Sequence, residues 1–312
     1  MGRYIARRLI EIVPVLVLVS VFIFMLIRLV PGDPAALLAG SDATPEEVEQ
    51  TREQLGLTGS PVTQYVRWLG DALRLDFGNS FRYRLPVSEV IRDQLEPTLQ
   101  LGVSAYLFTL VVGIVGGVLA ARSRTWNVVV NGIASVSVGF PTFVLGILLV
   151  VVFAVWLGWL PAGGAVSFTE DPLEAVKHLI LPTIALGSVT AAVLMRFVRT
   201  AMRDVLSEDY VRTARAKGLR ERVIINRHAL RNALIPVITV SALQLGRLLG
   251  GALVVEQVFA RPGLGRLLVG AIQGRDYVLI QALVLMLVLV FVFANLLADI
   301  LYGLADPRVR HS

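Results

Sequence analysis

Apolar residues dominate six long stretches of the chain, and polar residues gather between these stretches. The six stretches are residues 9–30, 98–121, 130–157, 179–198, 234–258 and 277–302. A helix needs about 20 mostly apolar residues to cross the hydrocarbon core of a bilayer. We therefore predict six membrane-spanning helices. Arginines precede the first stretch as in a signal peptide, but its apolar run exceeds the roughly 7–15 residues of a signal-peptide core, so we interpret it as a retained span.

The polar segment 31–97 carries its own helix signals. Thr44-Pro45-Glu46-Glu47 combines an N-cap, a proline in the first turn and a capping-box glutamate, and Gly56 provides a stop. Ser60-Pro61 repeats the start signal. We predict a second helix there, with an apolar face formed by Tyr65, Trp68, Leu69 and Leu73. The segment is thus expected to be a folded subdomain.

The polar segment between the fourth and fifth spans, about residues 199–233, predicts two short helices. Leu206, Tyr210 and Ala214 recur at helical spacing, Gly218 lies where a helix would end, and residues 223–230 resume the pattern. We interpret this segment as a compact projection whose small alanines fit a groove of a partner. Its basic residues would pair with acidic groups there. The alternative is a basic amphipathic helix that lies on anionic lipid.

Composition and charge agree with a membrane protein and orient it. Apolar residues make up 55% of the 312 residues and charged residues only 17%, and the mean hydropathy is +0.72. With the N-terminus inside, the inner segments hold seventeen basic and five acidic residues, whereas segment 31–97 holds six basic and eleven acidic ones. Basic residues favour cytoplasmic loops, so both termini are predicted to be cytoplasmic. The net charge of +6 is then explained without nucleic acid.

Motifs for catalysis are absent from the sequence. It has no Gly-x-x-x-x-Gly-Lys-Ser/Thr loop for nucleotide phosphates, no zinc-protease or serine-hydrolase motif, and no cysteine. An intramembrane protease would need paired polar groups at bilayer depth. The charged residues that could lie at this depth are Glu11, Arg28, Arg247, Glu256 and Asp299. We therefore expect neither an enzyme nor a cofactor or metal in this chain.

A set of short motifs, in fixed order along the whole chain, resembles one transporter family. The motifs are Pro31-Gly32-Asp33-Pro34, Leu55-Gly56-Leu57, Asp76-Phe77-Gly78-Asn79-Ser80, Phe140-Pro141-Thr142-Phe143, Glu208-Asp209-Tyr210-Val211-Arg212-Thr213-Ala214-Arg215-Ala216-Lys217-Gly218, His228-Ala229-Leu230-Arg231-Asn232-Ala233-Leu234-Ile235-Pro236, Val255-Glu256, Pro262-Gly263-Leu264-Gly265 and Asp306-Pro307-Arg308. The sequence resembles the permease subunits of ATP-binding-cassette (ABC) importers for dipeptides, oligopeptides, glutathione and nickel. Within that family it resembles the branch with a large external segment after the first span.

The resemblance implies an all-α membrane protein with the type I importer fold and six spans. It also implies one cytoplasmic segment and span at 1–30, an external subdomain at 31–97 and a permease core at 98–312. The chain would form half of a translocation path in the bacterial cytoplasmic (inner) membrane. Its expected partners are a homologous permease subunit, two ABC ATPases that use ATP and Mg, an external substrate-binding protein and the lipid bilayer.

The resemblance also assigns the segment at about 199–233 as the loop that couples to the ATPases. Importers carry a Glu-Ala-Ala-x-x-x-Gly pattern there, and alignment on Gly218 places Arg212-Thr213-Ala214 at the Glu-Ala-Ala position. Glu208 or Asp209 would then supply the acidic contact. The predicted coupling residues are Glu208, Asp209, Tyr210, Arg212, Ala214, Arg215, Lys217 and Gly218.

Arg247, near the middle of the fifth span, is the main candidate for the translocation path, together with Gln244 and Glu256. It would contact cargo or the wall of a wet path, or else pair with Asp299 or a backbone carbonyl. The spacings Gly113-x-x-x-Gly117 and Gly246-x-x-x-Gly250 predict close helix packing.

Two functions of other classes remain as alternatives. A stand-alone ion-coupled transporter or channel would predict buried acidic relay residues or inverted repeats, and the sequence shows neither. A scaffold for the ATPase would give no role to Arg247 or to the external subdomain. The cargo cannot be read from these motifs, since dipeptide, oligopeptide, glutathione and nickel-chelate importers share them.

Overall fold

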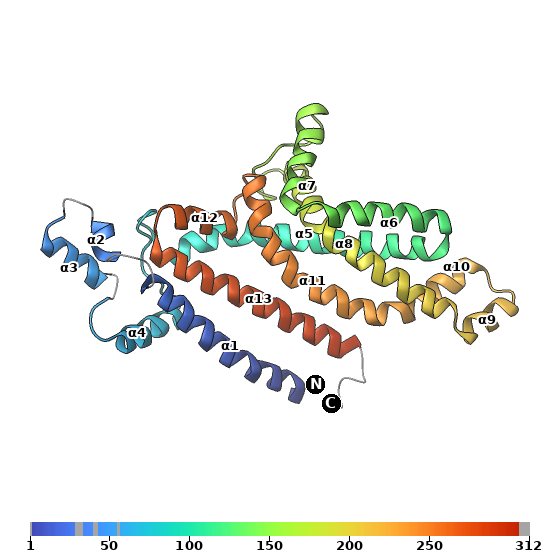
Figure 1. Cartoon of the computed structure of the whole chain (residues 1–312), viewed down its shortest axis with the longest axis horizontal. Helices are drawn as coiled ribbons and strands as arrows, with labels where there is room; N and C mark the ends of the chain where they lie inside the picture. Colours follow the sequence, from blue (N-terminus) through green and yellow to red (C-terminus); the bar gives the residue numbers. More distant parts are fainter. Residues whose placement is uncertain (1, 29–33, 40–42, 55–56, 306–312) are drawn as a thin grey trace. The chain divides into compact units, whose positions relative to one another are not determined.

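A computed structural model describes residues 2–28, 34–39, 43–54 and 57–305 (Figure 1). All regular elements in these ranges are helical, and one isolated antiparallel bridge joins Asn79 and Pro86. The chain divides into two compact units. The first comprises residues 96–266 and 293–312, and the second comprises residues 2–95 and 267–292.

Most of the helices follow one another with short connections, and the longer connections are residues 74–86 and 157–171. The first four are α1 (Gly2–Arg28), α2 (Pro34–Ala39), α3 (Pro45–Gln54) and α4 (Pro61–Leu73). The next five are α5 (Val87–Arg122), α6 (Arg124–Gly139), α7 (Thr142–Leu149), the π-helix η1 (Val150–Trp156) and α8 (Pro172–Leu206). The remainder are α9 (Asp209–Ala216), α10 (Glu221–Val223), the π-helix η2 (Ile224–Ala229), α11 (Leu230–Val258), α12 (Leu264–Gln273) and α13 (Tyr277–Ala305).

Among the described residues, four helices are long and apolar enough to span a membrane, namely α5, α8, the part of α11 from Pro236, and the part of α13 up to Leu296. The described apolar part of α1, Ile10–Met25, is shorter. The predicted span over residues 130–157 is broken, because α6 and the α7–η1 helix meet at a bend of 107°. Phe140 is extended there (φ −99°, ψ 132°), since the following Pro141 disfavours a helical conformation. If the bent pair counts as one span, the described residues hold five.

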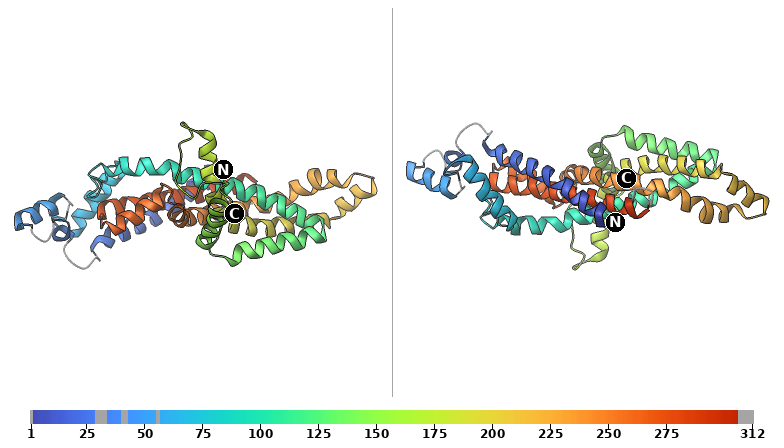
Figure 2. Two further views of the ribbon diagram at one scale, coloured as in Figure 1. Left: turned by 90° about the horizontal axis from the view of Figure 1, so that it is seen from above. Right: turned by 90° about the horizontal axis from the view of Figure 1, so that it is seen from below.

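Helix α8 is the central helix of the unit 96–266. In its most apolar stretch 61% of the residues are buried, against 28% in α5 and 33% in α11. Figure 2 shows α6 running alongside α8, which also packs against α7 and α11. One apolar cluster at the η1 end of the unit joins α5, α8 and α11 through Leu101, Ala105, Leu181, Ala185, Leu186, Leu248, Ala252 and Val255. A second cluster joins α8 to η2 and the start of α11.

Small residues let these helices approach closely. A Cβ atom added at Gly113 would lie 2.8 Å from the Leu194 side chain, and one at Gly117 would lie 2.5 Å from that of Val198. The predicted close packing at Gly113 and Gly117 is thus confirmed, with α8 as the partner. The second spacing behaves differently. A Cβ added at Gly250 would meet no atom within 4 Å beyond its chain neighbours and its own helix backbone, whereas one added at Gly251 would lie 2.8 Å from Leu186.

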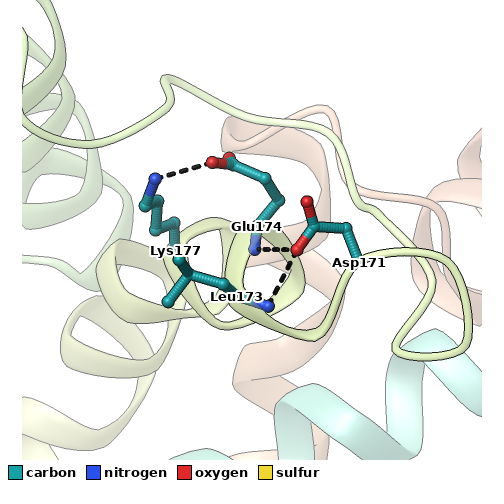
Figure 3. A network of polar contacts seen from close by, with 4 residues as sticks. All are labelled: Asp171, Leu173, Glu174 and Lys177. Carbon is teal, nitrogen blue, oxygen red and sulfur yellow. Dashed lines mark hydrogen bonds and ion pairs between the residues drawn. The ribbon is translucent and has the colours of Figure 1, made fainter.

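The start of α8 is fixed by local polar contacts (Figure 3). Asp171 is the N-cap, and its Oδ1 accepts hydrogen bonds from the backbone N–H groups of Leu173 (3.0 Å) and Glu174 (3.1 Å). Glu174 pairs with Lys177 one turn on, at 2.6 Å. A carboxylate N-cap satisfies amides that have no partner within the helix, and it interacts favourably with the helix dipole.

In the second unit, the predicted starts of α3 and α4 are confirmed. Thr44 N–H donates to Glu47 Oε2 (2.8 Å) and Glu47 N–H donates to Thr44 Oγ1 (3.3 Å), which is a reciprocal capping box. Ser60 caps α4 through Thr63 N–H. The α4 face carries Trp68 into an apolar cluster with Ile23 and Leu285, whereas Leu73 is 78% exposed. Gly56, the predicted stop of α3, lies outside the described residues.

A loop at residues 76–86 is attached to the start of α13 in the same unit. Asp276 is completely buried, and its Oδ2 accepts hydrogen bonds from Ser80 Oγ (2.5 Å) and Arg82 N–H (3.1 Å). Its Oδ1 accepts from Leu279 N–H (3.1 Å) and so caps α13. Gly78 adopts φ +78°, a left-handed conformation that glycine tolerates. One buried carboxylate thus holds the loop and the helix together.

Candidate functional site

The predicted coupling segment is a helical hairpin between α8 and α11 (Figure 1). Helix α9 ends in a Schellman motif, in which Gly218 N–H donates to Arg215 O (2.9 Å) and Leu219 N–H donates to Ala214 O (3.3 Å). Gly218 has φ +77°, so the predicted glycine stop is confirmed. The chain then reverses into α10, η2 and α11, which follow one another without a break.

The hairpin has its own apolar core. Val211 and Ile224 are fully buried and Ala214 is 8% exposed, and the three pack together with Leu206. The methyl group of Ala214 is therefore covered by the hairpin itself, and the fit of the whole projection into a groove of a partner stays a prediction. Only a small side chain fits at that position between α9 and η2.

The outer surface of the hairpin is polar and mostly basic. Arg212 pairs with Asp209 (3.4 Å) and Arg215 pairs with Glu221 (2.9 Å), and all four side chains are largely exposed. Glu208, at the N-cap of α9, and Lys217, at its C-cap, are also exposed. Surface pairs of this kind contribute about 0–1 kcal/mol each, so they leave the charges available to a partner.

Tyr210 connects the exposed face of α9 to the second arm of the hairpin. Tyr210 is 41% exposed. Its hydroxyl donates a hydrogen bond to His228 O (3.5 Å) and accepts one from Asn232 Nδ2 (2.9 Å). The residue therefore presents an aromatic ring to the surface while its polar end fixes α9 to η2 and α11. An aromatic ring held in this way suits a docking surface.

The candidate path residues on α11 occupy different environments. Arg247 is exposed, and so are Leu243 and Val254 one turn before it and two turns after it. Gln244 is only 3% exposed, and its Oε1 has no hydrogen-bond partner in the described part of the chain. The Asp299 side chain, the predicted alternative partner of Arg247, lies outside the described side chains.

Glu256 is enclosed completely by its own chain. Its Oε2 accepts hydrogen bonds from the N–H groups of Gly265 (2.7 Å) and Arg266 (3.2 Å), and its Oε1 accepts from Thr98 Oγ1 (2.6 Å). The Thr98 hydroxyl in turn accepts from Leu264 N–H (2.8 Å). The carboxylate therefore caps the start of α12 and ties the end of α11 to α5. Its predicted role in the path stays a prediction.

The glycines near Glu256 are needed because the carboxylate lies so close to them. A Cβ at Gly263 would lie 2.2 Å from the Glu256 carboxyl carbon, and one at Gly265 would lie 2.5 Å from Leu253 Cα. The string Pro262-Gly263-Leu264-Gly265 is thus the wall of a carboxylate pocket. Ala260 adopts φ +46° just before it, in the turn that follows α11.

Arg261, which the sequence did not single out, is a buried charge next to this pocket. It is 1% exposed, and its Nη2 donates to Gln100 Oε1 (3.0 Å). Burial lowers the pKa of the Arg261 guanidinium from its ordinary value, and the negative charge of Glu256 opposes that shift. Asp276 was missed as well. Its place just before an apolar helical run was an available N-cap signal.

Three parts of the motif set lie outside the described residues: 31–33, 55–56 and 306–308. The remaining motifs coincide with structural features. They lie at the Asp276 loop, the α6–α7 break, the hairpin and the Glu256 pocket. Within the described residues, no group of His, Asp or Glu is arranged to hold a metal ion.

Comparison with protein families and curated proteins gives a consistent result. Residues 113–311 match the model "Binding-protein-dependent transport system inner membrane component", and residues 1–102 match the corresponding N-terminal model. The chain is 44% identical over 313 residues to the glutathione transport system permease protein GsiC of Escherichia coli (strain K12), with 100% of both chains covered. It is equally similar, over the same length, to a Brucella abortus (strain 2308) protein named provisionally as a peptide transport system permease.

Solved structures show the same fold. An inward-facing structure of the MetNI methionine ABC transporter has a chain that matches with a TM-score of 0.55 and 19% sequence identity, over 70% of this chain and 96% of that one. The likeness confirms the all-α importer-permease fold. Such permeases work with an ATPase that consumes ATP and with a substrate-binding protein, and they are multi-pass proteins of the inner membrane. The chain belongs to the family of inner membrane components of binding-protein-dependent transport systems, as a permease subunit of an ABC importer.

Proposed function

We propose that this permease forms one half of the translocation path of an importer for peptide-like cargo, a class that includes glutathione. The names of the relatives support this cargo class, since the identity of 44% extends over the whole length of the chain. A single copy has too few spans to enclose a route for a peptide. The other half is therefore a homologous permease, and two ATPases that use ATP and Mg bind the pair.

The observation that carries the proposal is the α9–η2 hairpin. It is a projection with its own apolar core, a glycine-dependent reversal and an exposed face with Tyr210, Arg212 and Lys217. The coupling residues named from the sequence all lie in this hairpin or at its start. Both termini and the hairpin face the cytoplasm, which agrees with the excess of basic residues in these segments.

In this mechanism the hairpin transmits the motion of the ATPases to α8 and α11. Closure of the ATPases on ATP moves the hairpins of the two permeases together and opens the path towards the binding protein. The chain itself supplies no catalytic group. It supplies a docking surface, a wall of the path and, with segment 31–97, a platform for the binding protein.

The test is uptake by the reconstituted complex. The chain is co-expressed with the permease, ATPase and binding-protein genes next to its own, and the purified complex is placed in vesicles that contain ATP. Uptake of labelled dipeptides or glutathione that requires both ATP and the binding protein is the expected result. Uptake driven by an ion gradient, in vesicles that hold this chain without ATPases, would overturn the proposal.

A further inference from the structure

A polar cavity of about 1080 Å³ lies within the unit formed by residues 2–95 and 267–292. Its wall comes from the end of α1, from α4, from the loop at residues 76–86 and from the start of α13. Cavities that bind small molecules measure roughly 300–1,000 Å³, so the space is large enough for a short peptide.

The wall concentrates positive charge in a segment that is acidic as a whole. Four arginines line the cavity (Arg28, Arg67, Arg82 and Arg84), against two aspartates (Asp71 and Asp76). Segment 31–97 has eleven acidic and six basic residues, so this excess of arginine is local. Like charges gathered in a concave surface raise the local concentration of oppositely charged solutes.

Two of the arginines are held in place by the surrounding structure. Arg28 donates to Phe24 O (3.1 Å) and to Gln64 Oε1, and its guanidinium lies 3.7 Å from the centre of the Phe24 ring. Arg82 Nη1 donates to Gly270 O (2.9 Å) and lies over Gly274, where an added Cβ would come within 3.1 Å of it. These contacts use only part of the five N–H donors of each guanidinium.

Within the described residues, the other two arginines keep all their side-chain donors available. In the described part of the chain, the side chains of Arg67 and Arg84 form neither a hydrogen bond nor an ion pair, although Asp71 and Asp76 line the same cavity. Asp76 instead accepts from Gly78 N–H (3.1 Å). Among the described residues, the cavity therefore presents positive and negative groups that are not joined in ion pairs.

We propose that this arginine-lined cavity receives the peptide-like cargo as a zwitterion before it enters the path. Arg67 and Arg84 bind a cargo carboxylate, for which the forked guanidinium is well suited, and Asp71 and Asp76 face its ammonium group. Arg28 and Arg82 form the fixed part of the same wall. The inference rests on the proposed function, which supplies the cargo class and places segment 31–97 outside the cell.

The test uses the absence of cysteine from the natural chain. Asn79, which is exposed in the cavity wall, is replaced by cysteine in the complete importer in vesicles. Labelling rates are then measured with an anionic and a cationic methanethiosulfonate reagent. The anionic reagent is expected to react faster.

The double variant Arg67→Gln and Arg84→Gln should lower the ratio of the anionic to the cationic labelling rate roughly fivefold. Arg74→Gln, an exposed arginine outside the wall, should leave the ratio unchanged.

Protection by cargo completes the test. Millimolar alanyl-alanine should slow labelling of the cysteine at position 79, and its C-terminal amide should slow it less. Protection should disappear in the variant with both glutamines. If neither peptide protects, or if only the binding protein protects, the cavity is not a cargo site and the inference is overturned. ATP-driven uptake is measured in the same vesicles, so uptake without protection refutes the cavity alone, whereas absent uptake of any peptide refutes the proposed function.

Discussion

The reversal of the coupling hairpin requires Gly218 because of its backbone conformation, and not because the surrounding space is too small for a side chain. Gly218 has φ +77°, and apart from its two chain neighbours no residue has an atom within 4 Å of the position a Cβ would take. Gly218→Val should therefore be harmful, since a left-handed conformation costs ordinary residues about 1–2 kcal/mol and β-branched ones more. Gly218→Asn is the matched control, because asparagine tolerates this conformation.

The measurement is ATP-dependent uptake, together with ATPase activity stimulated by the binding protein, at equal yields of complex. We expect the valine variant to lose most of both activities and the asparagine variant to keep most of them. Equal activity in the two variants would show that the left-handed turn has no part in coupling.

Ala214 gives a second prediction at the scale of the residue. Because it is buried between α9 and η2, Ala214→Glu places a carboxylate in an apolar core, which costs several kcal/mol. The hairpin should open, and protease should cleave it faster in the purified complex. Ala216→Glu, the same change two positions on at an exposed site, should leave the cleavage rate unchanged. If both variants were cleaved at one rate, Ala214 would not be part of a packed core.

At the scale of the element, one face of α11 is exposed within the described part of the chain. Leu243 is 66% exposed and Val254 is 43% exposed, and Arg247 and Gly250 lie between them on the same helical face. An arginine in contact with lipid near the middle of a span is costly, by about 2.5 kcal/mol or more. The face is therefore expected to meet the water-filled path or the second permease.

Cysteine substitution at position 247 tests this expectation. A charged thiol reagent that does not cross membranes should label the Arg247→Cys variant in one nucleotide state more than in another. The control variant Leu248→Cys should stay unlabelled, because Leu248 is only 2% exposed. Arg247→Ala should impair uptake and leave assembly intact. A fall in the yield of complex, partly restored by a second change at Asp299, would instead identify an ion pair between helices.

The elements predicted from the sequence were those fixed by local signals. The caps at Thr44 and Ser60 and the stop at Gly218 each depend on residues within one turn, so their positions could be predicted. The size of the bend before Pro141 could not be predicted from local signals, because a proline can either kink a span or begin a new helix.

The parts that could not be predicted depend on residues far apart in the chain. Glu256 meets Thr98 across 158 positions, and Ser80 meets Asp276 across 196. No periodicity links such residues, and the glycines around Glu256 become interpretable only when the carboxylate is seen between them. The same reason explains why the burial of Ala214 inside the hairpin could not be predicted. Its helical face was evident from the spacing, but the partner of that face was the second arm of the hairpin.

At the scale of the whole molecule, the chain should have no nucleotide activity of its own. It has no phosphate-binding loop, and its family places ATP hydrolysis in partner subunits. The permease purified without partners is expected to neither bind nor hydrolyse ATP, measured by nucleotide binding and phosphate release. Adding the ATPases should restore activity. ATP turnover that followed this chain in constant proportion through every purification step would contradict the expectation.

Family membership also decides between the classes of function that the sequence left open. A stand-alone ion-coupled transporter would need relay groups inside one chain, whereas a permease of this family shares its work among several chains. The structure is consistent with a function that is divided among several chains. Gln244 keeps a buried acceptor without a partner in the described chain, and an apolar face of α5, with Val103, Leu107, Val111 and Val115 at intervals of one turn, is exposed.

The unbroken helical run from Glu221 to Val258 has a mechanical consequence. At about 1.5 Å per residue, its 38 residues follow a helical path of roughly 55 Å that begins in the hairpin and ends at the turn held by Glu256. Helices bend at π-helical turns and at prolines, and this run contains both, in η2 and at Pro236. In the proposed mechanism these two places would decide how much of a movement of the hairpin reaches the turn held by Glu256.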